Sequence, residues 1–164
     1  RVNGNAYTFF LEEVSKLLKA RKKLLTLHLE TNLLIPDDRG KISSYPHNFE
    51  WQLEKWVKEI GDEFEIRGIF QVRPWNLQKA IDTFSAATRT AGKSLYLQGD
   101  FHGMAFDGPF DCTRAEIDVV NNHSGLDGYV FYETANITRI NDEGEVEGSP
   151  EAAELLKQYS CRQK

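Results

Sequence analysis

The sequence is poor in the residues and patterns that mark several common classes of protein. It has two cysteines among 164 residues, with neither a disulfide signature nor a Cys/His spacing typical of zinc sites. No apolar run approaches the roughly 20 residues of a membrane-spanning helix. The net charge is −5, so the chain lacks the basic excess that a nucleic-acid-binding surface requires. These absences argue against zinc-binding, membrane-spanning and nucleic-acid-binding proteins, and they leave a globular domain with its own core.

Two further absences bear on the kind of domain. No glycine-rich phosphate-binding loop follows the first predicted strand, which disfavours a Rossmann nucleotide-binding domain. Neither an initiating methionine nor a signal-peptide pattern opens the chain, whose residues 1–4 read RVNG. We therefore expect residues 1–164 to form one domain that is a piece of a longer protein. The sequence leaves open whether Cys112 and Cys161 form a disulfide.

What the chain does have is an alternation of apolar patterns with the periods of helices and strands. Helical spacing of apolar residues, with capping residues and glycine stops, alternates with short extended runs. The patterns predict helices at 7–22, 48–60, 77–91, 111–121 and 149–158, and strands at 24–30, 66–73, 94–100 and 126–133. A leading helix followed by four strand–helix units predicts an α/β fold with a parallel sheet, because parallel strands require long crossovers.

Loop lengths narrow this prediction to a barrel. The predicted loops after strands are long, at 31–47, 101–111 and 134–148, whereas the loops after helices are short. Long strand-to-helix loops on one rim are typical of (β/α)8 TIM-barrel enzymes. We therefore predict a TIM barrel of which this chain supplies about four strand–helix units, as the second, C-terminal half. Half a barrel leaves two open strand edges, so we expect the remaining half to come from the same longer chain or from a dimer partner.

The alternation of side chains along each strand predicts which residues line the barrel. The inward sets are Thr26, His28 and Glu30; Ile69, Gln71 and Arg73; Tyr96, Gln98, Asp100 and His102; and Tyr129, Phe131 and Glu133. The last inward residue of each strand faces the active-site mouth of a TIM barrel, which selects Glu30, Arg73, Asp100 and Glu133. Burying so many ionisable groups for stability alone would be costly. These residues therefore predict a polar catalytic floor.

Each of these residues also has a plain structural interpretation. A single acid at a strand end is often a solvated loop residue or a helix cap. His28 fits a hydrogen-bonded barrel-core histidine as well as an active-site residue, and Trp75 either stacks on a sugar ring or packs against its neighbours. His102 stands in a glycine-containing loop beside Asp100, where a substrate contact is the better interpretation. His28, Arg73, Trp75 and His102 are accordingly candidate substrate-binding residues.

Carboxylates that converge on one rim suit glycoside hydrolysis, which requires two carboxyl groups across the scissile bond. One acts as general acid and the other as nucleophile or general base. Glu30, Asp100 and Glu133 are the candidate catalytic acids. Arg73 would hold a carboxylate ionised, or bind a hydroxyl or acid group of the substrate. We expect no cofactor and no metal ion for this chemistry.

Three stretches resemble the end of glycosyl-hydrolase-like TIM-barrel proteins, the bacterial family-ten-like glycosidase relatives. They are 95–101 (LYLQGDF), 125–133 (GLDGYVFYE) and 149–156 (SPEAAELL). The resemblance implies a TIM barrel that acts on or binds carbohydrate, often envelope polysaccharide or peptidoglycan, and it points to a periplasmic or extracellular location. The largest clan of barrel glycosidases ends its seventh strand in a glutamate nucleophile, whereas Asp100 stands at the matching position here. The retaining mechanism of that clan is therefore in question for this chain.

Two alternatives stand beside the glycosidase hypothesis. A non-catalytic carbohydrate-binding barrel would share the fold and the aromatic residues without needing paired acids. A metal-dependent barrel hydrolase or lyase would use His28, Glu30, Asp100 and His102, but the sequence has no His-x-His pair or close histidine cluster. Sugar release by the full-length protein separates the first two hypotheses, and a bound divalent ion would favour the third.

Overall fold

The computed structural model describes residues 4–29, 52–67, 74–100, 110–132 and 137–160. In these residues the strands are β1 Thr26–Leu29, β2 Glu63–Arg67, β3 Ser94–Asp100, β4 Gly128–Tyr132, β5 Thr138–Ile140 and β6 Val146–Gly148. The helices are α1 Asn5–Ala20, α2 Leu53–Lys55, the π-helix η2 Trp56–Ile60, α3 Pro74–Thr90, α4 Asp111–Asn122 and α5 Pro150–Ser160. The predicted α/β fold with a parallel sheet is confirmed.

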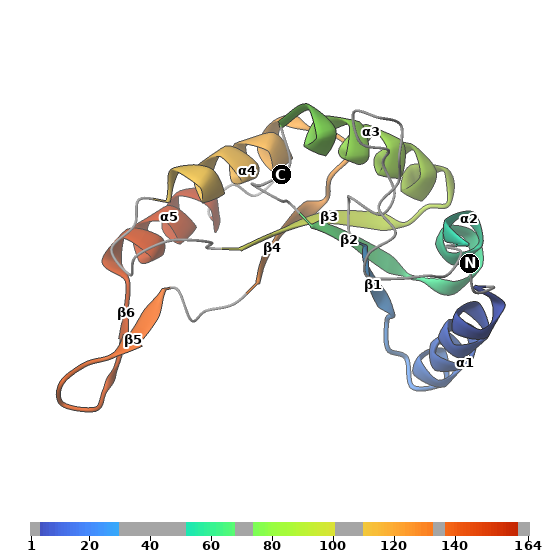
Figure 1. Cartoon of the computed structure of the whole chain (residues 1–164), viewed down its shortest axis with the longest axis horizontal. Helices are drawn as coiled ribbons and strands as arrows, with labels where there is room; N and C mark the ends of the chain where they lie inside the picture. Colours follow the sequence, from blue (N-terminus) through green and yellow to red (C-terminus); the bar gives the residue numbers. More distant parts are fainter. Residues whose placement is uncertain (1–3, 30–51, 68–73, 101–109, 133–136, 161–164) are drawn as a thin grey trace.

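The parallel sheet has the strand order β1-β2-β3-β4, so each strand pairs with the one that follows it in the chain. Because parallel crossovers are right-handed, a sheet that always grows in the same direction places its connecting helices on one face. Figure 1 shows this arrangement: the sheet forms an arch with α3 and α4 over its outer side, and α1 lies beyond β1. The arrangement is compatible with part of a TIM barrel.

Alternating apolar residues of the strands form the core under the helices. Leu27, Leu29, Phe64, Ile66, Leu95 and Leu97 belong to one buried cluster with Trp56, Ile60, Ile81, Phe84 and Val120 from the helices. Phe64, Ile66, Leu95 and Leu97 have no exposed surface. Burial of such a side chain stabilises the fold by about 1.5–3 kcal/mol. The leucines of β1 thus meet the helices, as their alternation predicted.

An aspartate before every second strand holds the start of the preceding strand. The backbone N–H of Leu25 donates to Oδ2 of Asp62 at 3.0 Å, and that of Leu95 donates to Oδ2 of Asp127 at 2.9 Å. In return, the backbone N–H groups of Asp62 and Asp127 donate to the carbonyls of Leu25 and Leu95. The same reciprocal contact therefore joins β1 to β2 and β3 to β4 at the amino-terminal rim. No pattern in the sequence indicates that this contact occurs twice.

The second strand and the third helix both begin at earlier residues than predicted. The second strand was predicted at 66–73, but β2 begins at Glu63 and ends at Arg67, and residues 68–73 lie outside the described part of the chain. The strict alternation of Glu63, Phe64, Glu65, Ile66 and Arg67 explains the earlier start, because it puts two apolar residues into the core. The third helix was predicted to begin at residue 77, but α3 already begins at Pro74.

The predicted inward parity of the fourth strand is wrong. Register pairs Tyr129 with Leu97 and Phe131 with Gly99, so both aromatic residues lie on the helix-covered face. Tyr129 confirms this by donating from its hydroxyl to Oε2 of Glu116 in α4 at 2.5 Å. The face shared with Gln98 instead carries Val130. The alternation of side chains could not predict which face of β4 meets the helices, because both faces present apolar or aromatic residues.

Residues 138–148, within the predicted long loop 134–148, form a hairpin. β5 and β6 pair antiparallel through Ile140 and Val146, and Gly144 turns the chain with φ of +83°. The following helix begins as predicted: Ser149 Oγ accepts from the backbone N–H of Ala152 at 3.2 Å. Among the described helices, none combines the length and the hydropathy needed to cross a membrane.

Candidate functional site: the polar face of the sheet

The face of the parallel sheet opposite the helix-packed core carries polar side chains on three successive strands. Register places them side by side, on the face opposite the strand residues that pack under the helices. We call this set the polar face; it consists of Thr26, His28, Glu63, Glu65, Arg67, Tyr96 and Gln98. It brings together two carboxylates, an imidazole, a guanidinium, a phenol, an amide and a hydroxyl. Such a mixture of donors and acceptors is what a polyhydroxylated or charged ligand needs.

Glu63 stands at the amino-terminal end of β2, deep on the polar face. Its Oε2 accepts from the Thr26 hydroxyl at 3.0 Å, and its Oε1 accepts from the Tyr96 hydroxyl at 3.4 Å. Both carboxylate oxygens are therefore used in linking β1, β2 and β3. Because the mouth of a TIM barrel lies at the carboxyl ends of its strands, this position favours a structural role for Glu63.

Glu65 lies one strand repeat closer to the carboxyl ends, between His28 and Gln98. Its Oε2 is 3.7 Å from Nδ1 of His28 and accepts from Nε2 of Gln98 at 3.4 Å. Exposure rises across this row: Gln98 is 8% exposed, the Glu65 side chain 19% and the His28 side chain 36%. A carboxylate beside one imidazole nitrogen orients the ring. The half-exposed His28 ring is thus held in place on the polar face, where it can contact a bound group.

An arginine was predicted at the end of the second strand, and the structure has one there, but it is Arg67. β2 ends at Arg67, which pairs in register with Gln98 and is half-buried on the polar face. Arg73, the predicted residue, lies outside the described part. Glu63, Glu65 and Arg67 were missed, although their alternation with Phe64 and Ile66 is a clear strand signal.

Of the seven predicted site residues, the structure describes the side chain of His28 alone. It lies on the polar face, as its parity predicted. Asp100 is the last residue of β3 and pairs in register with Tyr132, and Trp75 is the second residue of α3. Glu30, Arg73, His102 and Glu133 lie outside the described residues. Whether these side chains converge on one rim stays a prediction.

Comparison with protein-family models, curated proteins and solved structures finds no match to this chain. The resemblance of the three stretches to glycosyl-hydrolase-like barrels therefore stays an expectation. Within the described ranges, no group of three or more histidine, cysteine, aspartate or glutamate residues is arranged to hold a metal ion. The polar face is the feature on which a functional proposal depends.

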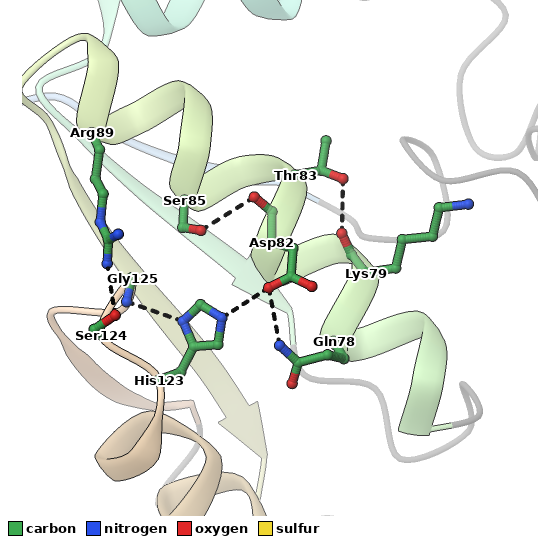
Figure 2. Close-up of polar contacts among 9 residues, drawn as sticks. All are labelled: Gln78, Lys79, Asp82, Thr83, Ser85, Arg89, His123, Ser124 and Gly125. Atoms are coloured by element: carbon green, nitrogen blue, oxygen red, sulfur yellow. Dashed lines mark hydrogen bonds and ion pairs between the residues drawn. The ribbon is translucent and has the colours of Figure 1, made fainter.

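A second histidine–carboxylate pair lies on the helix side, between α3 and the segment that enters β4. Figure 2 shows Nε2 of His123 directed at Oδ1 of Asp82, at 3.0 Å, while Nε2 of Gln78 donates to the same oxygen at 3.1 Å. Nearby, the Arg89 guanidinium donates to the Ser124 hydroxyl at 3.3 Å. The His123 hydrogen bond, followed by that of Gln78, lowers the pKa of Asp82 from its ordinary value of 3.8.

This pair resembles a catalytic dyad in composition but not in the roles of its ring nitrogens. The backbone N–H of Gly125 donates to Nδ1 of His123 at 3.0 Å, so Nδ1 is an acceptor and Nε2 carries the proton given to Asp82. Both ring nitrogens are therefore engaged in holding the chain. A general base needs a nitrogen that can accept a substrate proton. We conclude that Asp82 and His123 form a structural clasp between α3 and the start of β4.

Proposed function

We propose that this chain belongs to a TIM-barrel-type protein that binds carbohydrate on the polar face and hydrolyses a glycosidic bond at the carboxyl ends of its strands. The observation that carries the proposal is the contrast between the two faces of the sheet. One face packs against helices, whereas the other presents the polar face. In a closed barrel that face becomes the inner wall below the active-site mouth.

The chemistry of the polar face supports a sugar ligand. Each hydroxyl group of a sugar can both donate and accept a hydrogen bond. A sugar-binding site therefore combines acceptors such as carboxylates with donors such as amides and guanidinium groups. Glu65 accepts from Gln98 and lies beside His28, so an acceptor and donors stand next to one another. Arg67, in register with Gln98 and two residues beyond Glu65 along β2, adds planar donors. The resemblance to family-ten-like glycosidase relatives is part of this proposal, and so is envelope polysaccharide or peptidoglycan as the substrate.

The proposed catalytic acids are Glu30, Asp100 and Glu133, each of which follows or ends a strand. For Glu133 the proposal depends on this position in the chain alone, because the predicted inward parity of the fourth strand is wrong. Hydrolysis requires two of them to flank the scissile bond as general acid and as base or nucleophile. In this proposal Glu65 is a positioning residue, because it acts on the substrate through the His28 ring. His28, Arg73, Trp75 and His102 are the proposed substrate contacts.

A non-catalytic carbohydrate-binding barrel is the second candidate, and one observation favours it. The carboxylates of Glu63 and Glu65 are both engaged with neighbouring side chains, by hydrogen bonds in both cases and also by the His28 ion pair of Glu65. Engaged carboxylates fit a rigid binding surface at least as well as a reacting centre. Hydrolysis of a bound glycan distinguishes the glycosidase from the non-catalytic barrel.

The test is sugar release by the full-length protein from purified peptidoglycan and from β-1,4-linked hexasaccharides of glucose, xylose and N-acetylglucosamine. We expect Asp100→Asn or Glu133→Gln to lower release by at least about 10²-fold, since general acid–base catalysis contributes 10²–10⁴-fold. Glu65→Gln should shift the pH profile of release and change KM and kcat unequally, which a purely structural role would not do.

Glu154→Gln is the matched control, because Glu154 is an exposed carboxylate on α5. It should leave release unchanged. Full activity in both Asp100→Asn and Glu133→Gln would refute the assignment of these acids. Glycan binding by calorimetry without any release would favour the non-catalytic barrel. Neither binding nor release of any of these glycans would overturn the carbohydrate proposal.

A further inference from the structure

Tyr96 contributes a phenol ring to the polar face. It is the only phenylalanine, tyrosine or tryptophan on this face whose side chain the structure describes. Tyr129 and Phe131, the aromatic residues of β4 that were predicted to point inward, lie on the helix-covered face instead. Trp75, the aromatic contact predicted from the sequence, has no described side chain. In the described part of the chain, an aromatic contact on the polar face therefore comes from Tyr96.

The Tyr96 ring is held between β2 and β4. Its hydroxyl donates to Oε1 of Glu63 in β2, in a long hydrogen bond of 3.4 Å. On the other side, Tyr96 pairs in register with Gly128 of β4. A β-carbon at Gly128 would lie 3.3 Å from Cδ1 and 3.5 Å from Cε1 of the ring. One edge of the ring thus lies close against the main chain of Gly128, which the missing side chain makes possible.

A ring held in this way is ordered before a ligand arrives. The contacts with Glu63 and Gly128 restrict its rotation, and Tyr96 is only half-buried, so part of the ring stays open on the polar face. Side chains that are already ordered lose little conformational entropy when a ligand binds. The open part of the Tyr96 ring is therefore suited to bind an apolar surface.

The residues around Tyr96 divide this side of the sheet into a polar and an apolar part. On β2, Glu65 is the register partner of Tyr96, and its Oε2 accepts from Gln98 at 3.4 Å. On β4, the residues on the same face are Gly128 and Val130, and neither has a side chain that forms hydrogen bonds. Tyr96 stands at the boundary between these two parts.

A sugar ring has the same division. Its hydroxyl groups project mainly around the rim, where they donate and accept hydrogen bonds. Its C–H groups form apolar patches on the two ring faces, and their hydrogens carry a small positive charge that the negative face of an aromatic ring attracts. A phosphate or a carboxylate ligand has no such C–H face. The arrangement around Tyr96 therefore matches a sugar better than a small anion.

We infer that Tyr96 is the stacking platform of the sugar site: its ring packs against the C–H face of a pyranose unit, and Glu65 and Gln98 bind hydroxyl groups at the rim of the same unit. This inference rests on the carbohydrate binding proposed above. It adds a ligand contact to that site and names the ligand class as a glycan of pyranose units. It requires no hydrolysis, so it applies to the non-catalytic barrel as well.

Calorimetry with the full-length protein and the β-1,4-linked hexasaccharides of glucose, xylose and N-acetylglucosamine tests the inference. Tyr96→Phe keeps the ring and should bind within about threefold of the original protein, whereas Tyr96→Leu loses the aromatic face and should bind about tenfold more weakly. Tyr7→Leu is the matched control, because Tyr7 is a 42% exposed tyrosine on α1, outside the polar face. It should leave the affinity unchanged.

Saturation-transfer NMR reads the contact directly. Irradiation of the aromatic protons of the protein should transfer most saturation to the C–H protons of one sugar face. This preference should persist in Tyr96→Phe and disappear in Tyr96→Leu, which a loss of stability alone would not cause.

Gly128→Val tests the platform without changing Tyr96. The added side chain displaces the edge of the ring and should weaken binding about tenfold. Gly148→Val is its control, because a β-carbon at Gly148 meets no atom within 4 Å.

The outcomes separate this inference from the proposed function. Binding by Tyr96→Leu that equals binding by the original protein would overturn the inference and leave the proposed function standing. An equal loss in Tyr96→Phe and Tyr96→Leu would also overturn it, because the ligand would then depend on the hydroxyl that bonds Glu63 and not on the ring. If the original protein binds none of the three hexasaccharides, the proposed function fails and this inference fails with it.

Discussion

Gly99 shows how one residue without a side chain makes room for a polar contact inside the fold. It lies in β3 opposite Phe131, on the helix-covered face. A β-carbon at Gly99 would overlap both the Tyr129 hydroxyl and Oε2 of Glu116, the two groups that bond at 2.5 Å. Glu116 is 2% exposed, and a buried carboxyl group depends on such a partner.

We expect Gly99→Ala to destabilise the protein by about 1–3 kcal/mol, since overpacking forces neighbouring side chains out of place. Urea unfolding measures the change. Gly148→Ala is the matched control, because a β-carbon there meets no atom within 4 Å. If the two variants unfold at the same urea concentration, the close packing of Gly99 against Tyr129 and Glu116 is wrong.

Sequence reasoning at the residue scale worked where alternation was unambiguous. His28 was placed on the correct face because Leu27 and Leu29 flank it with apolar side chains that have to be buried. Glu65 was missed because the second strand was started three residues late. Its importance comes from cross-strand register with His28 and Tyr96, which a single sequence does not reveal.

At the scale of elements, the clasp between α3 and the entry to β4 is the clearest tertiary contact that no pattern indicated. Asp82 is in the middle of α3, whereas His123 follows the last residue of α4. Neither position has a motif. The contact exists because the two helices lie next to each other over the sheet (Figure 1) and the chain turns at Gly125, whose N–H fixes the imidazole.

The lowered pKa of Asp82 sets the direction of a pH effect. A carboxyl group whose pKa is lower in the folded than in the unfolded protein stabilises the fold above its unfolded pKa, near 3.8. That contribution is lost as the pH falls through the folded pKa. We expect Asp82→Asn to lower the urea midpoint at pH 6, and the difference from the original protein to become smaller as the pH falls below 3.8.

Asp142→Asn is the control for this experiment, because Asp142 is an exposed carboxylate at the tip of the β5–β6 hairpin. It should leave the urea midpoint unchanged at both pH values. A difference between Asp82→Asn and the original protein that is as large at pH 2.5 as at pH 6 would contradict the clasp as the source of the pH effect.

At the scale of the whole molecule, stability is concentrated in the middle of the parallel sheet. β2 and β3 each lie between two described strands, and their apolar residues are fully buried. The β5–β6 hairpin is a separate two-stranded sheet with Ile140 73% and Val146 77% exposed. Isolated hairpins are marginally stable, so the parts of this molecule should open with different free energies.

Native-state hydrogen exchange measures that difference. We expect the amides of β2 and β3 to exchange slowest, through global unfolding, and those of β5 and β6 to exchange by local opening at a free energy near zero. Addition of denaturant should accelerate exchange in β2 and β3 and leave the hairpin unchanged. Equal protection of the hairpin and the central strands would show that the hairpin is part of the same cooperative unit.

The sequence by itself determined the order of helices and strands, the parallel sheet and the buried faces of β1 and β3. It did so because leucines alternating with polar residues have one low-energy orientation against a helix layer. Only the tertiary structure decided the face on which Tyr129 lies, the start of β2 and the meeting of His28 with Glu65. These features depend on register and helix packing between distant segments, where several local patterns are equally good and burial of the whole sheet selects one.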